Sequence, residues 1–149
     1  MTRRSRAREV ALQLLFQRDQ NPKVDRPAIE RFALERLRHG DLAQFCLTLY
    51  DGVVGRLEEI DRRLTEAAEN WRVVRMAGVD RNVLRLGAFE LLFAPDALPA
   101  VAINEAIELA RRYGSADSPA FVNGVLDRLV PHSEAPVESQ VAMPSSETP

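Results

Sequence analysis

The sequence predicts an all-α protein with six or seven helices in one domain. Apolar residues recur at three- and four-residue spacing along most of the chain, whereas no stretch keeps the strict alternation of a half-buried strand. Hydrophobic residues make up 46% of the 149 residues and charged residues 28%. That balance is typical of a soluble globular domain with enough apolar surface to bury a core.

The first predicted helix, over residues 4–17, begins in an arginine-rich segment, residues 3–8, which we call the arginine arm. Its basic residues, all before the first acid, are Arg3, Arg4, Arg6 and Arg8. Such a cluster is a candidate phosphate-binding element, although a solvated helix start explains it equally well. In both interpretations we expect the first turn and its arginines to be exposed rather than buried.

Two further helices are predicted before residue 70. The first covers residues 25–40, with Gly40 as a left-handed cap at its end. The next, over residues 41–64, is expected to be the longest in the protein, because its apolar residues keep helical spacing throughout. Gly52 and Gly55 lie on or near this run, where they would allow a close helix crossing and weaken the helix locally.

The second half of the chain predicts three more helices after a short connection at residues 71–78. They cover residues 80–94, 101–113 and 118–129. In the last of them, Ser118 is expected to act as a hydroxyl N-cap before Pro119. Phe121 falls at the edge of that helix's apolar stripe. A ring there is either a core residue at the rim or a platform on which a flat ligand stacks, and composition alone favours the core.

The distribution of charge argues against a nonspecific nucleic-acid binder. Lys and Arg total 20, against 22 Asp and Glu. Residues 131–149 form an acidic tail without periodicity, which we expect to be disordered. The remaining body is close to neutral, whereas nonspecific nucleic-acid binders are strongly basic.

Motifs for catalysis or for cofactors do not occur in the sequence: it has no G-x-G-x-x-G, no phosphate-binding loop and no metal-ligand cluster. The carboxylate pairs Glu58–Glu59 and Glu105–Glu108 lie on helices dense in charge, where a solvated face is the simpler explanation. We therefore expect no enzymatic activity, no cofactor and no metal. No apolar run approaches the ~20 residues of a membrane span, and no export signal follows the N-terminus. The single cysteine, Cys46, lies among apolar residues and is expected in the core of a cytoplasmic protein.

Four blocks of the chain, taken in order, resemble the NusB family. They are Arg6-Ala7-Arg8-Glu9…Ala11…Gln13; Trp71…Arg75…Val79-Asp80-Arg81…Leu84-Arg85-Leu86-Gly87-Ala88-Phe89-Glu90-Leu91; Pro99…Val101-Ala102-Ile103-Asn104-Glu105-Ala106-Ile107-Glu108-Leu109-Ala110…Tyr113-Gly114; and Asp117-Ser118…Phe121-Val122-Asn123-Gly124-Val125-Leu126-Asp127. The match runs over residues 3–130, and its specificity comes from the combination of the four blocks.

The resemblance implies a helical bundle of two three-helix subdomains, here about residues 1–69 and 70–130. It implies a transcription antitermination factor that binds boxA RNA together with NusE, a small-subunit ribosomal protein. The complex would join RNA polymerase and other Nus factors to suppress termination, notably on ribosomal RNA operons. The family also contains homodimers that bury the RNA surface.

The same resemblance implies which residues contact RNA. The family's arginine arm falls on Arg4, Arg6 and Arg8, and its aromatic contact falls on Phe121, beside Asp117 and Ser118. Two departures from the family pattern imply weaker RNA binding by the chain alone. Ser5 and Ala7 interrupt the arginine arm, and Ala120 stands where a basic residue is common.

Two alternative functions remain open at this point. The same helical domain resembles the N-terminal module of certain ribosomal-RNA cytosine methyltransferases, which would require a catalytic domain beyond this chain. The other alternative is a purely protein-binding helical module, in which Phe121 belongs to the core and the arginines only increase solubility.

Overall fold

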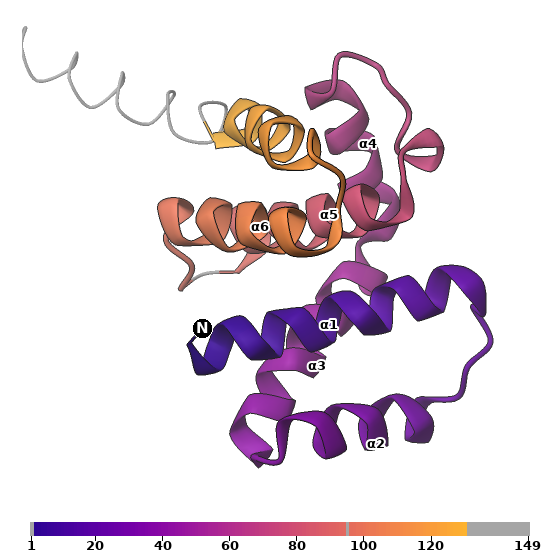
Figure 1. The fold of residues 1–149 in the computed structure, drawn as a ribbon. Coiled ribbons are helices and arrows are strands. Elements are labelled where there is room, and N and C mark those ends of the chain that lie inside the picture. The colour runs from indigo at the N-terminus through magenta and orange to yellow at the C-terminus, as the bar shows by residue number, and fades with distance from the viewer. Residues whose placement is uncertain (1, 95, 131–149) are drawn as a thin grey trace, which may run out of the picture.

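The computed structural model describes residues 2–94 and 96–130, and every regular element in these ranges is helical (Figure 1). The elements are α1 (Arg3–Gln20), α2 (Arg26–Leu37), α3 (Gly40–Gly55), α4 (Leu57–Ala67), the 3₁₀ helix η1 (Val73–Arg75), α5 (Gly78–Phe93), α6 (Pro99–Tyr113) and a last helix over residues 118–130. The all-α prediction is confirmed. The disordered acidic tail predicted for residues 131–149 lies outside the described residues.

The helices form two layers that share one core. In Figure 1, α1, α2 and α3 make the lower layer, and α4, α5, α6 and the helix over residues 118–130 make the upper one. Helix α5 packs on α4 and α6 within its layer and also on α1 and α3 of the other layer. Residues 82–90 of α5 are all buried, so both layers fold around this one helix.

A contact between α3 and α5 joins the layers. A Cβ atom placed on Gly52 of α3 would overlap the ring of Phe89 on α5, so this ring fills the space that a side chain at position 52 would need. The close helix crossing predicted at Gly52 stays a prediction. Gly55 has no such neighbour, since an added Cβ there would meet nothing within 4 Å.

The uninterrupted helix predicted over residues 41–64 is wrong. Arg56, with φ −122° and ψ 26°, breaks it into α3 and α4. Gly55 favours a break at this point because glycine costs about 1 kcal/mol more than alanine in a helix. After the break, α4 packs mainly on α5, and the side chains of Ile60 and Leu64 are completely buried. The predicted subdomain boundary near residue 69 stays a prediction.

The boundary between α2 and α3 also differs from the expected one. Helix α2 ends at Leu37, and Arg38 takes the left-handed conformation (φ 61°) while its N–H donates to the carbonyl of Leu34. Gly40 is therefore the first residue of α3 instead of the cap of α2, and Asp41 lies in the first turn of α3.

The core contains the single cysteine, as predicted. Cys46 has no exposed surface, and burial raises the pKa of its thiol to about 12, which makes it unreactive at neutral pH. Within the part of the chain that the structure describes, no helix is long and apolar enough to cross a membrane.

Candidate nucleic-acid interface

The arginine arm is the first turn and a half of α1, and Thr2 determines where that helix begins. The Thr2 hydroxyl accepts a hydrogen bond from the Ser5 N–H at 3.0 Å, which is the geometry of an N-cap. Because the arm is helical, its arginines point in different directions at 100° per residue. They therefore meet different surroundings instead of forming one row.

Arg8 is buried, which contradicts the expectation that the arm is exposed. Its Nε lies 2.7 Å from Glu90 Oε2 and its Nη2 lies 2.9 Å from Glu90 Oε1, a bidentate pair, while Glu105 Oε1 is 3.7 Å from its Nη1. The reason is tertiary: the face of α1 that carries Arg8 packs on α5, and α6 supplies the second carboxylate. Burial opposes the charged form, but the hydrogen bond and charge of Glu90 outweigh it and raise the pKa of Arg8.

Arg4 and Arg6 are the arginines of the predicted RNA site that reach the surface. Arg4 is exposed, and its guanidinium carbon lies 4.2 Å from the centre of the Phe45 ring. Arg6 pairs with Glu9, with Nη1 2.6 Å from Oε1, and 40% of its side chain is exposed. Arg4 can therefore meet a phosphate without opening a buried ion pair, whereas Arg8 cannot. Arg6 lies between these two cases, because it is partly exposed but its partner Glu9 is buried.

Glu9 joins the arginine arm to the far end of α6. Its buried carboxylate accepts hydrogen bonds from Arg6 and from the hydroxyl of Tyr113, and Arg112 Nη1 lies 3.4 Å from Oε2. Burial by itself would raise the pKa of Glu9, but the hydrogen bonds from Tyr113 and Arg6 outweigh burial and lower it. Since Tyr113 is the last residue of α6, this cluster couples the arm to the turn that leads into the last helix.

The turn before the last helix corrects the role predicted for Ser118. Ser118 is 2% exposed, and its Oγ accepts from the N–H of Ser115 at 3.0 Å, so the hydroxyl closes the preceding turn. The first backbone hydrogen bond of the helix runs from the Phe121 N–H to the carbonyl of Asp117 at 3.1 Å. Ser118 is therefore not the N-cap, and Asp117 stands exposed at the helix start.

Phe121 combines the two alternatives considered for it. The side chain is half-buried and packs against the core, while its ring lies 5.1 Å from that of Trp71, centre to centre, at an angle of 54°. Trp71 is 51% exposed. Sequence reasoning treated Trp71 as part of a short connection, although an isolated tryptophan between polar residues was a signal that could have singled it out.

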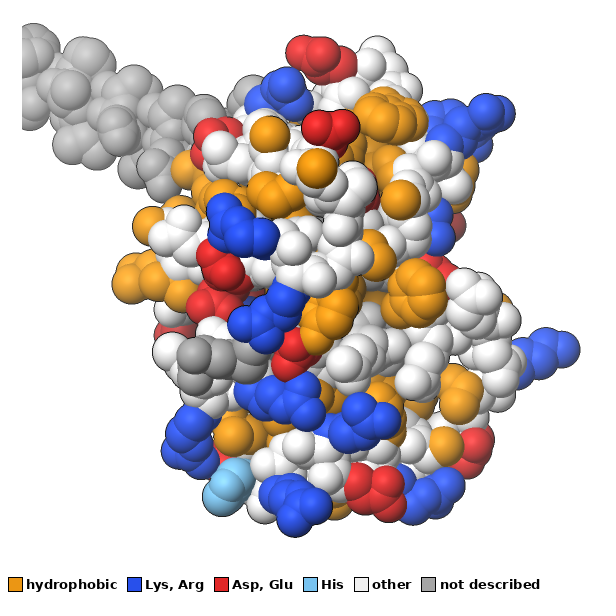
Figure 2. All heavy atoms as spheres, in the orientation of Figure 1, with side chains coloured by type: hydrophobic (Ala, Val, Ile, Leu, Met, Phe, Trp, Pro, Cys, Tyr) orange, Lys and Arg blue, Asp and Glu red, His pale blue; other side chains and the backbone are white. Residues whose placement is uncertain are grey.

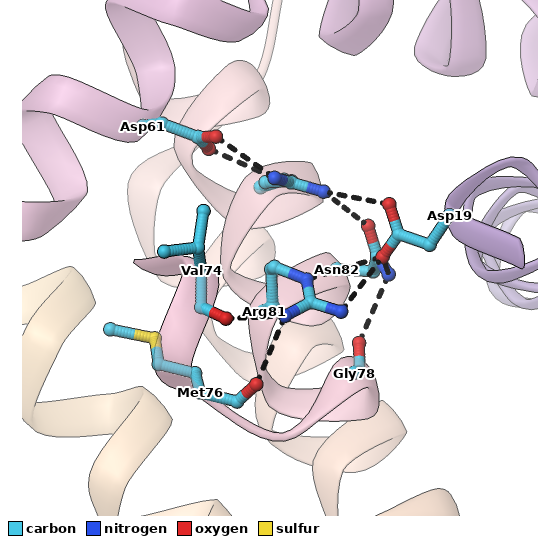
Figure 3. A network of polar contacts seen from close by, with 8 residues as sticks. Asp19, Asp61, Val74, Met76, Gly78, Arg81 and Asn82 are labelled. Atoms are coloured by element: carbon cyan, nitrogen blue, oxygen red, sulfur yellow. Dashed lines mark hydrogen bonds and ion pairs between the residues drawn. The ribbon is translucent and has the colours of Figure 1, made fainter. Parts of the chain in front are cut away.

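A polar network holds the connection that carries Trp71 (Figure 3). Arg81 donates from Nη1 to the carbonyls of Met76 at 3.0 Å and Val74 at 3.3 Å, and from Nε to Asp19 at 3.2 Å. The segment after α4 is thereby fastened both to α5 and to the end of α1.

The same network continues to α4 through a buried arginine. Arg85 donates to both carboxylate oxygens of Asp61, at 2.9 and 2.8 Å, and to Asp19 at 3.3 Å. Asn82 adds a hydrogen bond to Asp19 at 2.9 Å. Burial would raise the pKa of Asp19, but the Asn82 hydrogen bond and the two arginines lower it. No sequence pattern indicated this network.

The surface of α1, α6 and the last helix is not uniformly basic. Figure 2 shows basic side chains over both layers, separated by acidic and apolar ones. This agrees with the near-neutral body predicted from the composition, and it limits the electrostatic contribution to binding a polyanion.

Comparison with known proteins decides the family. The model of the NusB family matches residues 5–131. The chain belongs to the NusB family. The identification from four sequence blocks is therefore confirmed, and the family is one of transcription antitermination factors.

Curated relatives match the chain over almost their whole length. The transcription antitermination protein NusB of Desulfatibacillum aliphaticivorans is 43% identical over 132 residues, which are 89% of this chain and 92% of that protein. That of Sorangium cellulosum is 44% identical over 129 residues, 87% of this chain and 92% of the relative.

Solved NusB structures share the fold. NusB of T. maritima is 36% identical and superimposes with a TM-score of 0.78, covering 95% of this chain and 98% of its own. A NusB solved in complex with NusE and double-stranded RNA is 27% identical, with a TM-score of 0.79, covering 89% of this chain and 98% of its own.

Among the predicted site residues, the structure places Arg4 and Arg6 at the start of α1, and Asp117 and Phe121 just beyond the end of α6. The Glu9 cluster connects these two places. The RNA contacts assigned to the six predicted residues stay predictions, and so does the absence of catalysis.

Proposed function

We propose that this NusB-family protein binds boxA RNA together with NusE and acts with RNA polymerase and other Nus factors to suppress termination, notably on ribosomal RNA operons. The observation that carries the proposal is family membership over residues 5–131, alongside a NusB of the same fold solved with NusE and RNA.

The chain offers two kinds of RNA contact. Phe121 presents part of its ring at the surface, where a base can stack, and such stacking contributes about 1–3 kcal/mol per base. Arg4 offers an exposed guanidinium group to phosphates, and Arg6 offers a partly exposed one that is paired with Glu9. Arg8 and Ser118 are buried in their own hydrogen bonds, so in this proposal they position the arm and the helix start.

A separate apolar groove suits the protein partner, and we place NusE there. The groove has a volume of about 370 Å³ and is lined by Leu12, Gln13, Phe16, Gln17, Phe32, Arg36, Val79 and Tyr113. Phe16 is 39% exposed, and the side-chain oxygen of Gln13 is buried without a hydrogen-bond partner. A buried acceptor without a donor is costly, so a partner that brings a donor and apolar side chains fits this groove better than RNA does.

The test is fluorescence anisotropy of a labelled boxA-like RNA titrated with the protein, alone and with purified NusE, at two salt concentrations. The proposal expects binding that tightens with NusE and weakens with salt. No binding under any of these conditions would favour the purely protein-binding module instead.

Two further points of the proposal need their own measurements. The methyltransferase-module alternative predicts that the domain binds RNA without any response to NusE, so the same titration distinguishes this alternative from the proposed function.

Whether the protein forms a homodimer is measured by light scattering, and the proposal expects RNA to compete with any dimer that covers the arm.

A further inference from the structure

The surface beside Phe121 holds a second aromatic side chain, that of Trp71. The two rings are in contact at 5.1 Å, and about half of the Trp71 surface faces solvent. Burial of an indole is strongly favourable, so an indole that stays half-exposed beside a second partly exposed ring offers a flat apolar surface to a ligand.

We propose that Trp71 is a second stacking platform of the RNA surface, and that Arg72 and Arg75 bind the phosphates of the nucleotides held there. The proposal rests on the RNA-binding function proposed above. It extends the site from the single ring of Phe121 to the connection between α4 and α5.

The tilt of the two rings determines how RNA can lie on them. At 54° between the ring planes, one continuous stack of bases cannot lie flat on both rings. The pair instead suits two neighbouring bases that are splayed apart, the arrangement in which proteins hold unpaired RNA.

Two arginines lie at the ends of the short helical turn that follows Trp71. Arg72 directly precedes η1 and Arg75 is its last residue. The Arg75 N–H donates to the carbonyl of Arg72 at 2.9 Å, so the two residues stand at opposite ends of one turn. Both are exposed, and neither forms an ion pair with a carboxylate of the described residues. The hollow next to Arg72 is lined by three carboxylates and one further arginine, namely Glu58, Asp61, Glu66 and Arg62, whereas Arg75 does not line it.

The connection is ordered before any ligand arrives. Val73 and Met76 are buried, and Arg81 holds the carbonyls of Val74 and Met76, as Figure 3 shows. At the other end, Arg128 donates to the carbonyl of Ala67 at 2.7 Å. Binding RNA therefore does not have to order this segment, which leaves more of the stacking energy for affinity.

The experiment uses the fact that Trp71 is the only tryptophan of the chain. A boxA-like single-stranded RNA is titrated into the full-length protein, alone and with NusE. Anisotropy of the RNA label reports binding, and tryptophan emission reports the surroundings of Trp71. Trp71→Phe gives the emission background of NusE. The proposal expects the emission of Trp71 to change in step with the anisotropy.

Variants then separate stacking from structure. Trp71→Leu is expected to weaken RNA binding about fivefold or more, which is the low end of the range for one stacked base, whereas Trp71→Phe stays within about twofold. Val74→Ala, which changes an exposed neighbour in the same connection, leaves the affinity unchanged. Arg75→Gln lowers the slope of log affinity against log salt by about 1. If Trp71→Leu fails to fold, as judged by circular dichroism, the Trp71 emission of the unmodified protein and the Arg75→Gln slope still decide.

Three results would overturn the proposal. RNA binding with unchanged Trp71 emission and an unchanged Arg75→Gln slope would remove this connection from the site while leaving the proposed function intact. Loss of NusE affinity instead of RNA affinity in Trp71→Leu would make it a protein contact. No RNA binding by the unmodified protein, with or without NusE, would overturn the proposed function together with this inference.

Discussion

Single residues show that position along the arginine arm does not determine what an arginine does. Arg4 and Arg8 are one helical turn apart on α1, yet Arg4 is exposed over the Phe45 ring while Arg8 is buried against Glu90. An exposed cation can exchange water for phosphate at little cost, whereas a buried pair cannot be opened without leaving a charge in the interior. Replacing Arg8 should therefore mainly lower stability, whereas replacing Arg4 should mainly weaken RNA binding.

Replacing Arg8 by alanine tests its structural role. We expect Arg8→Ala to lower the free energy of unfolding by about 3–5 kcal/mol, because Glu90 then stays buried without its partner. Urea denaturation measures this. Arg4→Ala is the matched control from the same arm, with an expected stability change below about 1 kcal/mol and a salt slope of RNA binding reduced by about 1. Equal stability losses in the two variants would contradict the burial of Arg8.

The Phe121 ring can be tested with little disturbance of the core. Phe121→Leu keeps an apolar side chain against the core but removes the flat face, so RNA affinity should fall about fivefold or more. The melting temperature should change by only a few degrees. Phe16→Leu is the control: it changes another partly exposed phenylalanine, on α1, and should leave RNA binding by the chain alone unchanged. A large stability loss in Phe121→Leu with unaltered RNA binding would return Phe121 to the core.

At the scale of elements, Asp19 fastens α1 to α5 and, through Arg81, to the connection that carries Trp71. Its pKa is lower in the folded protein than the ordinary value of 3.8. A carboxyl with a depressed folded pKa contributes stability that is present above its unfolded pKa and is lost as the pH falls through the folded pKa. The junction of these elements should thus weaken in acid.

The corresponding prediction compares Asp19→Asn with the unmodified protein at two pH values. At pH 7 the variant should be less stable by about 1–3 kcal/mol, because the charge-assisted hydrogen bonds to the arginines are weakened. At pH 3 and below, the difference should shrink, because the aspartate is itself becoming protonated. Urea midpoints measure both. Asp41→Asn is the control, because Asp41 forms only an exposed ion pair with Arg3 at 3.9 Å, and its effect on stability should not depend on pH. A stability difference between Asp19→Asn and the unmodified protein that stays constant across pH would refute the linkage.

At the scale of the whole molecule, the two layers share one core instead of behaving as separate bundles. Leu49 on α3, Ile60 and Leu64 on α4, and Leu84 on α5 are among its largest buried side chains. Where α3 crosses α5, the Phe89 ring packs directly on Gly52. Layers that share a core should unfold in one cooperative transition.

Adding one methyl group at this crossing tests that arrangement. Gly52→Ala should destabilise the protein by about 1–3 kcal/mol, because the new Cβ overlaps the Phe89 ring in a packed core. Gly55→Ala, three residues further on, meets no neighbour and should be neutral or slightly stabilising. Thermal unfolding followed by far-ultraviolet circular dichroism measures both. Two separate transitions in either variant would contradict a shared core.

The sequence by itself determined the helical class, most of the buried faces and the family. Helical periodicity is a local property, so the stripes that bury Leu84 and Leu126 can be recognised without knowing what they pack against. The four family blocks contain such local patterns together with the arm and Phe121. The sequence thus located both candidate RNA elements, although it assigned exposure to Arg8 and capping to Ser118.

Only the tertiary structure decided which polar groups are buried and paired. Arg8 and Glu90 are 82 positions apart in the sequence, and Asp19 and Arg85 are 66 positions apart, so no local spacing of residues predicts either pair. Gly55 only weakens the helix locally, and the apolar pattern continues across Arg56, so the pattern alone does not reveal that α4 turns away to pack on α5. The contact of Trp71 with Phe121, 50 positions away, has the same origin. A helix's own sequence defines its faces, but the partner that each face meets is set by chain segments far away in sequence.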